Sequence, residues 1–333
     1  NSYRRIGKHL PLITIGDIHS KILPREYFLF MVNGLFPIQE LLIHNAFRKL
    51  IKNNHNIDTI IYPYEEKSIE RAILLSIEDN SKITSIGYSH SVHWNMHYYF
   101  QVRPFRHANP PRPDLYAVTG ELEKWWLHKI ANVPNSKIKV LGSSRYVEKK
   151  YPIPTCCYET RKMKVLIVVG QSCDLNILAN YLEDEPKIFD KCELLIRKYP
   201  FSWEKEQNIG ISRIKKFVDD LKVNNEEMLQ THIKWCDIMI YNTSSCGIIA
   251  MLSGRIAINV ALHDMFYWNP FEKEGSKNAV IHCSSAFELN QTINHLQDLD
   301  AIKYKEIQNK QYFYAKNVYS SINNKVLNEL LKL

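Results

Sequence analysis

The sequence lacks the short signatures of several common catalytic and binding sites. It has no G-x-G-x-x-G fingerprint and no Walker lysine, so it does not predict a standard dinucleotide site or an ATP P-loop. No H-E-x-x-H motif and no histidine-rich tract points to zinc. The seven cysteines form no C-x-x-C pair and are odd in number, which argues against a disulfide framework and indicates a reducing, cytosolic compartment.

Long apolar runs are also missing. The longest apolar stretch, YFLFMVNGLFPI at 27–38, is too short to span a bilayer and is interrupted by Asn33, Gly34 and Pro37. We interpret it as part of the core, with an interfacial membrane helix as the alternative. No internal repeat or low-complexity tract appears, and nothing in the composition indicates a disordered or fibrous chain.

What the sequence does contain is an excess of positive charge and the length of two domains. Its 43 Lys and Arg residues outnumber 35 Asp and Glu residues, which gives a formal net charge of +8. This balance suits an anionic partner such as a nucleotide, an acidic sugar, a membrane surface or a nucleic acid. We place nucleic acid last, because the basic residues are dispersed and no recognised binding module appears. With 333 residues, two domains are expected.

Short apolar runs alternate with helical patterns along both halves of the chain. We expect strands at 11–16, 58–65, 83–91, 114–120 and 137–143 in the first half, and at 164–170, 192–200, 237–245 and 255–262 in the second. Strands alternating with helices predict an α/β protein with parallel, doubly wound sheets. The expected units are a first domain at 1–150, a Pro-containing linker at 151–163, a second domain at 164–302 and a C-terminal helical segment at 303–333.

The segment NTSSCG at 242–247 places Thr243, Ser244 and Ser245 where an expected strand gives way to a helix. Ligands of open parallel sheets bind beyond the carboxyl ends of the strands, and a helix N-terminus there offers backbone N–H groups and a positive dipole end. One hydroxyl would suffice for a helix cap. Three in a row, followed closely by Gly247, favour an anion-binding turn, with a simple cap as the alternative.

Two further strand ends in the second half carry groups suited to the same ligand. An arginine in LLIRKYP could meet a phosphate or a carboxylate with two hydrogen bonds, although a solvated charge pair is the alternative. The turn VVGQS resembles one that approaches a phosphate. The residues concerned are Arg197, Lys198, Tyr199 and Pro200 in the first segment, and Gly170, Gln171 and Ser172 in the second.

Carboxylates gather at the end of an expected strand in the segment YPYEEKSIE. Glu65 and Glu66 come directly after the strand, and Glu70 follows one helical turn later. A carboxylate at this position suits a general base or a nucleophile. It could equally complement the dipole at the start of the following helix.

Histidines and aromatic residues alternate in GYSHSVHWNMHYYF at 87–100. His90, His93 and His97 would share one face of a helix and could bind a metal, but the Gly, Tyr and Ser that precede them favour a loop. In a loop, an aromatic ring of this segment could stack on a sugar, or one histidine could transfer a proton.

The order of these segments resembles that of GT-B glycosyltransferases. It is similar in particular to bacterial surface-carbohydrate proteins related to the transferases that use CMP-Kdo and CMP-sialic-acid-type donors. The resemblance implies two facing Rossmann-like domains, for the acceptor and the nucleotide sugar, and a C-terminal helix that crosses back to the first domain. The segments that carry it, over most of the chain, are YPYE…E (62–70), GYSHS (87–91), RPDLYAVTG (112–120), LGSSRY (141–146), LIRKYP (195–200) and NTSSCGIIAMLSGRIAINV (242–260).

The resemblance also bears on the nucleotide. In CMP-sugar transferases of this architecture a His-Pro motif contacts the nucleotide, and a Ser-Ser turn holds its phosphate. Ser244 and Ser245 match the second motif. Tyr199 stands where the histidine would precede Pro200, which leaves the identity of the nucleotide open.

A catalytic carboxylate in the first domain is implied as well. Glu65 or Glu66 fits best, Asp114 and Asp17 are second choices, and His90 is a further catalytic candidate. An inverting enzyme would use the carboxylate as a general base on the acceptor hydroxyl, and a retaining one would use it as a nucleophile. Chemistry of this kind on a CMP-linked sugar does not inherently require a metal, so we expect metal independence and no cofactor.

The sequence thus predicts a cytoplasmic glycosyltransferase, with peripheral association at the inner face of the cytoplasmic membrane as an option. It would move Kdo or a nonulosonate from CMP to a hydroxyl of a glycan or lipid-linked glycan, in the synthesis of lipopolysaccharide or capsule. The residues expected to bind the sugar or acceptor are Tyr88, Trp94, Arg112, Asp114 and Arg145. Three alternatives stay open: a transferase that uses a UDP- or GDP-sugar, a nucleotide-sugar epimerase, and a non-catalytic glycan-binding protein.

Overall fold

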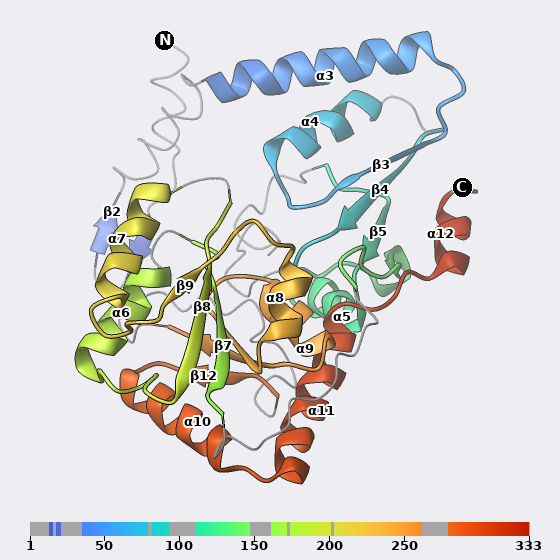
Figure 1. Ribbon diagram of the computed structural model, residues 1–333. Coiled ribbons are helices and arrows are strands. Elements are labelled where there is room, and N and C mark those ends of the chain that lie inside the picture. Colours follow the sequence, from blue (N-terminus) through green and yellow to red (C-terminus); the bar gives the residue numbers. More distant parts are fainter. Residues whose placement is uncertain are drawn as a thin grey trace. The chain divides into compact units, whose positions relative to one another are not determined.

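The computed structural model describes residues 13–15, 18–20, 35–78, 82–92, 111–146, 161–171, 174–200, 203–261 and 279–332 (Figure 1). These residues form two compact units, each described by itself below. The first unit holds the described residues up to 87 together with 111–115, and the second holds 88–92 and the described residues from 116 to 332. Most of the expected linker, 151–160, lies outside the described residues.

The second unit is built on a six-stranded sheet with the order β12-β11-β10-β7-β8-β9. All its neighbouring strands run parallel, and β7, β10 and β11 are nearly continuous apolar runs, as expected for a sheet that is covered on both faces. The strands are β7 (Met163–Val168), β8 (Cys192–Arg197), β9 (Lys222–Val223), β10 (Ile238–Tyr241), β11 (Ile256–Val260) and β12 (Ile281–Cys283).

Alternate residues of these strands enter two separate hydrophobic clusters, one on each face of the sheet. Val165 and Ile167 of β7 belong to one cluster, and Leu166 and Val168 belong to the other. The clusters are closed by α6 (Asp174–Asp184), α7 (Glu204–Ile214) and α10 (Ala286–Asp298) on the first face, and by α8 (Leu229–Trp235), α9 (Cys246–Leu252) and α11 (Ala301–Val318) on the second.

A four-stranded sheet with the order β3-β4-β5-β6 belongs to the first half of the sequence. Its strands are β3 (Thr59–Pro63), β4 (Thr84–Ser89), β5 (Leu115–Val118) and β6 (Ile138–Val140), and β5 and β6 run parallel. Its helices are α3 (Leu35–Asn53), α4 (Ser68–Ile77) and α5 (Glu121–Lys129), with a 3-10 turn at Asn135–Lys137. A short antiparallel pair, β1 (Ile13–Ile15) and β2 (Ile18–Ser20), precedes them. The two helix-covered sheets confirm the predicted α/β class.

The C-terminal part of the chain ties the second unit together. On α11, the buried amide of Gln311 accepts a hydrogen bond from the Ala257 N–H (2.8 Å) and donates one to the Ala257 carbonyl (2.9 Å), so it replaces a neighbouring strand at this point of β11. Beyond α11, the Ser320 N–H donates to the carbonyl of Thr119 at the end of β5 (2.9 Å). The chain therefore returns to the end of a strand from the first half of the sequence.

The expected helical stretch at 303–332 is divided in two. Residues 319–323 are extended, and they bond to the backbone at the ends of β5 and β6, with the Asn323 N–H donating to the Leu141 carbonyl (2.8 Å). The Asn323 side chain then caps α12 (Asn324–Leu330) by accepting from two of its first backbone N–H groups. No helix in the described part of the chain combines the length and the apolar character needed to cross a membrane.

Candidate functional site

The turn between β10 and α9 is held in place from both sides. From β11, the Asn259 side-chain amide donates to the carbonyls of Asn242 (2.6 Å) and Tyr241 (3.3 Å). On the helix side, Gly247 lies against the Tyr241 ring, where a Cβ would come within 2.7 Å of a ring carbon. The turn is therefore a fixed feature, and only glycine fits at position 247 without moving the ring.

The three hydroxyls of this turn have different surroundings. Ser244 Oγ accepts a hydrogen bond from the Cys246 N–H (3.3 Å), as a local cap would. Ser245 Oγ instead accepts from Nη1 of Arg145 (3.2 Å), which lies one hundred residues earlier in the chain. Thr243 Oγ1 is buried and has no hydrogen-bond partner among the described residues. The hydroxyl turn is therefore more than a helix cap.

The first backbone N–H groups of α9 are used within the turn. The Gly247 N–H donates to the Ser244 carbonyl (3.3 Å), and the Ile248 N–H donates to the Ser245 carbonyl (3.1 Å). An anion at this turn would therefore depend chiefly on side chains.

Two guanidinium groups act on the start of α9. Burial raises the pKa of the Cys246 thiol, while the Ser244 hydroxyl and the positive charges of Arg197 and Arg145 oppose that rise. Arg197 comes from the end of β8, where its Nη1 donates to the Glu227 carbonyl (2.6 Å) and lies 3.3 Å from Nδ1 of His232. Arg197 at the end of β8 and Arg145 in the loop after β6 thus both act electrostatically on the start of α9.

Tyr319 and Glu123 complete the surroundings of Arg145. Burial raises the pKa of the Tyr319 hydroxyl to about 12; the Arg145 charge opposes this, and the charge of the buried Glu123 adds to it. Burial also lowers the pKa of His232, and the nearby Arg197 lowers it further. His232 is therefore neutral near pH 7, and the two arginines supply the positive charge.

A second turn, between β7 and α6, packs against the hydroxyl turn. A Cβ on Gly170 would lie 2.7 Å from Thr243 Oγ1 and 2.8 Å from the Ser244 nitrogen, so a side chain there would displace the hydroxyl turn. Oδ2 of the buried Asp174 accepts from the N–H groups of Gly170 (2.6 Å) and Gln171 (3.0 Å). A carboxylate of the chain itself therefore occupies the anion position of this turn, and Ser172 lies outside the described residues.

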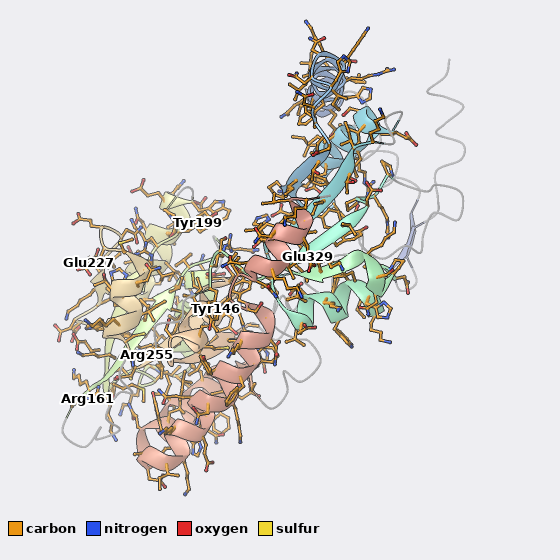
Figure 2. All side chains as sticks on the ribbon, turned by 90° about the vertical axis from the view of Figure 1, so that its right-hand side faces the viewer. Tyr146, Arg161, Tyr199, Glu227, Arg255 and Glu329 are labelled. Carbon is orange, nitrogen blue, oxygen red and sulfur yellow. The ribbon has the colours of Figure 1, made fainter. Side chains whose placement is uncertain are left out.

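Aromatic rings lie just beyond the end of β8. The Tyr199 ring faces that of Trp203 with 5.0 Å between centroids and an interplanar angle of 33°, and Trp203 is 39% exposed. The Gln207 side chain bonds both the N–H and the carbonyl of Tyr199, while the Lys198 N–H donates to Asn225 (2.8 Å). Pro200 is exposed. Figure 2 labels Tyr199 and Glu227, which mark this end of the sheet.

The turn between β3 and α4 gathers carboxylates. Glu66 is buried with a left-handed backbone (φ 58°), and its carboxylate accepts from the Tyr64 hydroxyl and from Nη2 of Arg71 (2.9 Å). Glu65 pairs with Lys67, and its backbone N–H donates to both carboxylate oxygens of Glu70 (2.9 and 3.1 Å). A left-handed glutamate at a strand end is a strained conformation of the kind that occurs at functional sites.

Glu70 was considered from the sequence only as a neighbour of Glu65 and Glu66, and its environment singles it out. Burial raises its pKa to about 7, against the effect of the backbone N–H groups that it accepts from. A carboxyl group that titrates near neutral pH can take up and release a proton. Its raised pKa depends on burial in the folded chain, which sequence spacing does not reveal.

The other expected sugar- or acceptor-binding residues are partly engaged in the fold. The Tyr88 hydroxyl donates to the Gly142 carbonyl (3.0 Å), and its ring lies 6.4 Å from that of His90. Oδ2 of Asp114 accepts from both the N–H (2.9 Å) and the hydroxyl (2.7 Å) of Ser85. Arg112 is half-buried. Trp94, His93, His97 and Asp17 lie outside the described residues.

No group of three or more His, Cys, Asp or Glu residues in the described ranges could hold a metal ion. The chain contains one D-x-D tripeptide, Asp298-Leu299-Asp300. Here it joins α10 to α11, and Asp300 Oδ1 accepts from the Lys303 N–H (2.8 Å) as the cap of α11.

Comparison with known proteins finds likeness at the level of structure alone. No family model and no curated protein sequence matches the chain. Among solved structures, MurG from Acinetobacter baumannii is 12% identical with a TM-score of 0.56, over 89% of this chain and 81% of that one. UDP-GlcNAc 2-epimerase from Neisseria meningitidis, bound to UDP-GlcNAc, is 12% identical with a TM-score of 0.57, over 87% of this chain and 80% of that one.

A third similar structure is the pneumococcal O-GlcNAc transferase GtfA in complex with UDP and GlcNAc. It is 13% identical with a TM-score of 0.53, over 86% of this chain and 58% of that one. The neighbours are GT-B fold proteins, and they include transferases and epimerases. The chain has the GT-B fold. Identities this low carry the fold and leave the activity to be argued from the site.

Proposed function

We propose that the chain is a glycosyltransferase that holds the anionic part of a nucleotide-sugar donor at the β10–α9 turn. The observation that carries this proposal is the hydrogen bond from Arg145 to Ser245, together with the positive charge of Arg197, which acts on Cys246 at the start of the same helix. Guanidinium groups bind phosphate and carboxylate with paired hydrogen bonds. The turn lies at the carboxyl end of a parallel strand, where ligands of open α/β sheets bind.

Comparison of three turns in the same sheet supports this choice. In the β7–α6 turn, Asp174 bonds the backbone N–H groups. In the β12–α10 turn, Glu288 accepts from both the N–H (2.7 Å) and the hydroxyl (2.9 Å) of Ser284. Both turns contain their own anion. The β10–α9 turn contacts a cation instead, so its charge can be balanced by an anion from outside the chain.

Two guanidinium groups suit a donor with two anionic groups. A CMP-linked acidic sugar such as Kdo or a nonulosonate has a phosphate and a carboxylate, and it is our first choice because the Ser-Ser turn matches the sequence resemblance. A UDP-sugar has two phosphates and fits the two charges about equally well. The aromatic pair of Tyr199 and Trp203 offers a surface on which the base could stack.

The acceptor in this proposal is a hydroxyl of a glycan or lipid-linked glycan, and the β3–α4 turn supplies the general base. The carboxylate of Glu66 pairs with Arg71, and Glu70 titrates near neutral pH. Either carboxylate could accept the proton that leaves the acceptor hydroxyl as it attacks the sugar. The proposed setting is the cytoplasmic synthesis of a bacterial surface polysaccharide.

An epimerase is the second candidate. Two of the similar structures, with TM-scores of 0.57 and 0.52, are named as UDP-GlcNAc 2-epimerases. The two activities differ in their need for an acceptor. A transferase releases its nucleotide only when a glycan acceptor is present, apart from slow hydrolysis. An epimerase converts its donor alone and returns a different sugar on the nucleotide.

The decisive experiment is binding of CMP, CDP, UDP and GDP to the purified protein, followed by thermal shift and by calorimetry. The test variant is Ser244→Ala with Ser245→Ala. The matched control is Ser284→Ala with Ser285→Ala, a hydroxyl pair that caps α10 in the same sheet. We expect one nucleotide to bind, the test variant to weaken it at least tenfold, and the control to leave it unchanged.

The outcomes separate the candidates. Binding of CMP alone supports the acidic-sugar donor, whereas a preference for UDP or GDP keeps the site and replaces the donor. Equal binding by the wild-type protein and the test variant places the nucleotide elsewhere. Absence of binding by every nucleotide overturns the proposed function.

A further inference from the structure

Helix α3 has one face covered and one face exposed. It packs against α4, with Ile51 buried and Nδ1 of His44 within 3.3 Å of the Ala72 carbonyl. Figure 1 shows α3 as a long helix lying over α4, and Figure 2 looks nearly along its axis, with side chains on all sides. The face of α3 that points away from α4 is therefore the exposed face of this helix.

Large apolar side chains occupy the first half of that exposed face. Ile38, Leu41 and Leu42 are 57%, 61% and 65% exposed. Their spacing of three and four residues places them on one side of the helix, along about one turn. Single exposed apolar residues are common on protein surfaces, but three that adjoin on one helix face form a patch that typically marks an interaction surface.

Lysines occupy the second half of the same face. At 100° per residue, Lys49 and Lys52 fall within about 35° of the mean direction of Ile38, Leu41 and Leu42. Both lysines are exposed. From 38 to 53 the helix contains three Lys or Arg residues and one acidic residue, Glu40. The outer face thus changes along the helix axis from apolar to positively charged.

We propose that the outer face of α3, defined by Ile38, Leu41, Leu42, Lys49 and Lys52, binds an anionic lipid membrane surface. An amphipathic helix that lies in the membrane interface inserts apolar side chains at the boundary of the acyl chains and places lysines among the headgroups. The charge complementarity favours anionic lipid over a neutral membrane, and the net charge of +8 adds long-range attraction. This inference does not rest on the proposed function, because it concerns a surface outside the nucleotide site.

The test is sedimentation of the full-length protein with vesicles of phosphatidylcholine containing one quarter phosphatidylglycerol, without nucleotide. Leu41→Gln with Leu42→Gln should reduce the partition coefficient at least tenfold, since the apolar side chains supply the insertion. Lys49→Gln with Lys52→Gln should reduce it by roughly fivefold for each lysine, and less at high salt. Vesicles of phosphatidylcholine alone should bind the wild-type protein more weakly.

The matched controls are exposed residues elsewhere in the chain. Phe287→Gln with Ile302→Gln removes two apolar side chains that are 58% and 74% exposed. Lys305→Gln with Lys316→Gln removes two exposed lysines of α11. These controls should bind vesicles as the wild-type protein does, and every variant should keep the thermal midpoint of the wild-type protein within a few degrees.

Three results would overturn the proposal. The wild-type protein could fail to sediment with the anionic vesicles. The α3 variants could bind as tightly as their controls. Size-exclusion chromatography could show a concentration-dependent dimer that Leu41→Gln with Leu42→Gln abolishes, which would assign the face to a second copy of the chain. Because the vesicle assay contains no nucleotide, failure of the proposed function would leave its outcome unchanged.

Discussion

The β10–α9 turn and the β3–α4 turn occupy equivalent positions, each at the point where a strand gives way to a helix, and they differ in charge. The first gathers three hydroxyls, one of which accepts from Arg145, and the charge of Arg197 acts on Cys246 beside them. The second gathers three glutamates, one of them with a left-handed backbone. The comparison teaches that the architecture provides the position, and that the side chains decide whether a turn suits an anionic ligand or a proton transfer.

The largest expected effect comes from removing a carboxylate. In Glu66→Gln the side chain keeps its shape and loses its charge, so it cannot accept a proton. If the β3–α4 turn supplies the general base, turnover should fall by roughly 10²- to 10⁴-fold while nucleotide binding stays unchanged. The control is Glu78→Gln, at the exposed far end of α4. A variant that transfers sugar at the wild-type rate would assign Glu66 a purely structural role, and Glu65→Gln and Glu70→Gln would then be compared in the same assay.

The opposite manipulation removes a cation from the β10–α9 turn. Arg145→Ala and Arg197→Ala should each weaken nucleotide binding by about tenfold to a hundredfold, because each deletes a charge-assisted contact. Calorimetry at two salt concentrations measures this, and the salt dependence should become shallower. Arg213→Ala, which removes a guanidinium paired with Glu183 on α6, serves as the control. If both test variants bound the nucleotide with unchanged affinity, the positive charge of the β10–α9 turn would not explain nucleotide binding.

A smaller effect is expected from changing the shape of the β10–α9 turn without altering its charge. In Gly170→Ala the new methyl group would press on Thr243 and Ser244. Overpacking costs about 1–3 kcal/mol, and here it should also weaken nucleotide binding several-fold. Gly210→Ala is the matched control, because its Cβ would lie 2.5 Å from Leu175 Cβ of α6 and would press on that helix instead of on Thr243 or Ser244. We expect both variants to lower the thermal midpoint and only Gly170→Ala to lower affinity; equal affinities would show that the turn tolerates displacement.

Much of the charge difference between the two turns could be predicted from the sequence. The fold could be predicted more fully than the site. Buried parallel strands are continuous apolar runs, so β8, β10 and β11 fall within the segments expected for them, and β7 begins one residue before its expected segment. The short β9, with two exposed residues, has no such run. The break at 319–323 could not be foreseen either, because it depends on backbone hydrogen bonds to strands nearly two hundred residues earlier.

The site shows the same division between local and long-range information. The sequence points to Thr243, Ser244 and Ser245 as candidates because they are adjacent in sequence and follow a strand. Asp174 was missed, although it lies only four residues after Gly170, because a carboxylate at a helix start has many roles and only its two hydrogen bonds distinguish them. The pairing of Arg145 with Ser245 joins residues one hundred positions apart. Proximity of that kind has no signature in a single sequence.

The smallest expected effect is a pH dependence that should distinguish the acidic turn from the basic one. Burial raises the pKa of Glu70 from 4.5 to about 7 in the folded chain. Between these values the unfolded chain has released the proton and the folded chain retains it, so the free energy of unfolding should fall as the pH rises from about 5 towards 7. Glu70→Gln mimics the protonated form and should remove this part of the slope, giving a thermal midpoint a few degrees above that of the wild-type protein at pH 8 and close to it at pH 5. Thermal melts across that range measure the difference. Parallel curves for the two proteins would mean that Glu70 ionises at its ordinary pKa, and the acidic turn would lose its titrating group.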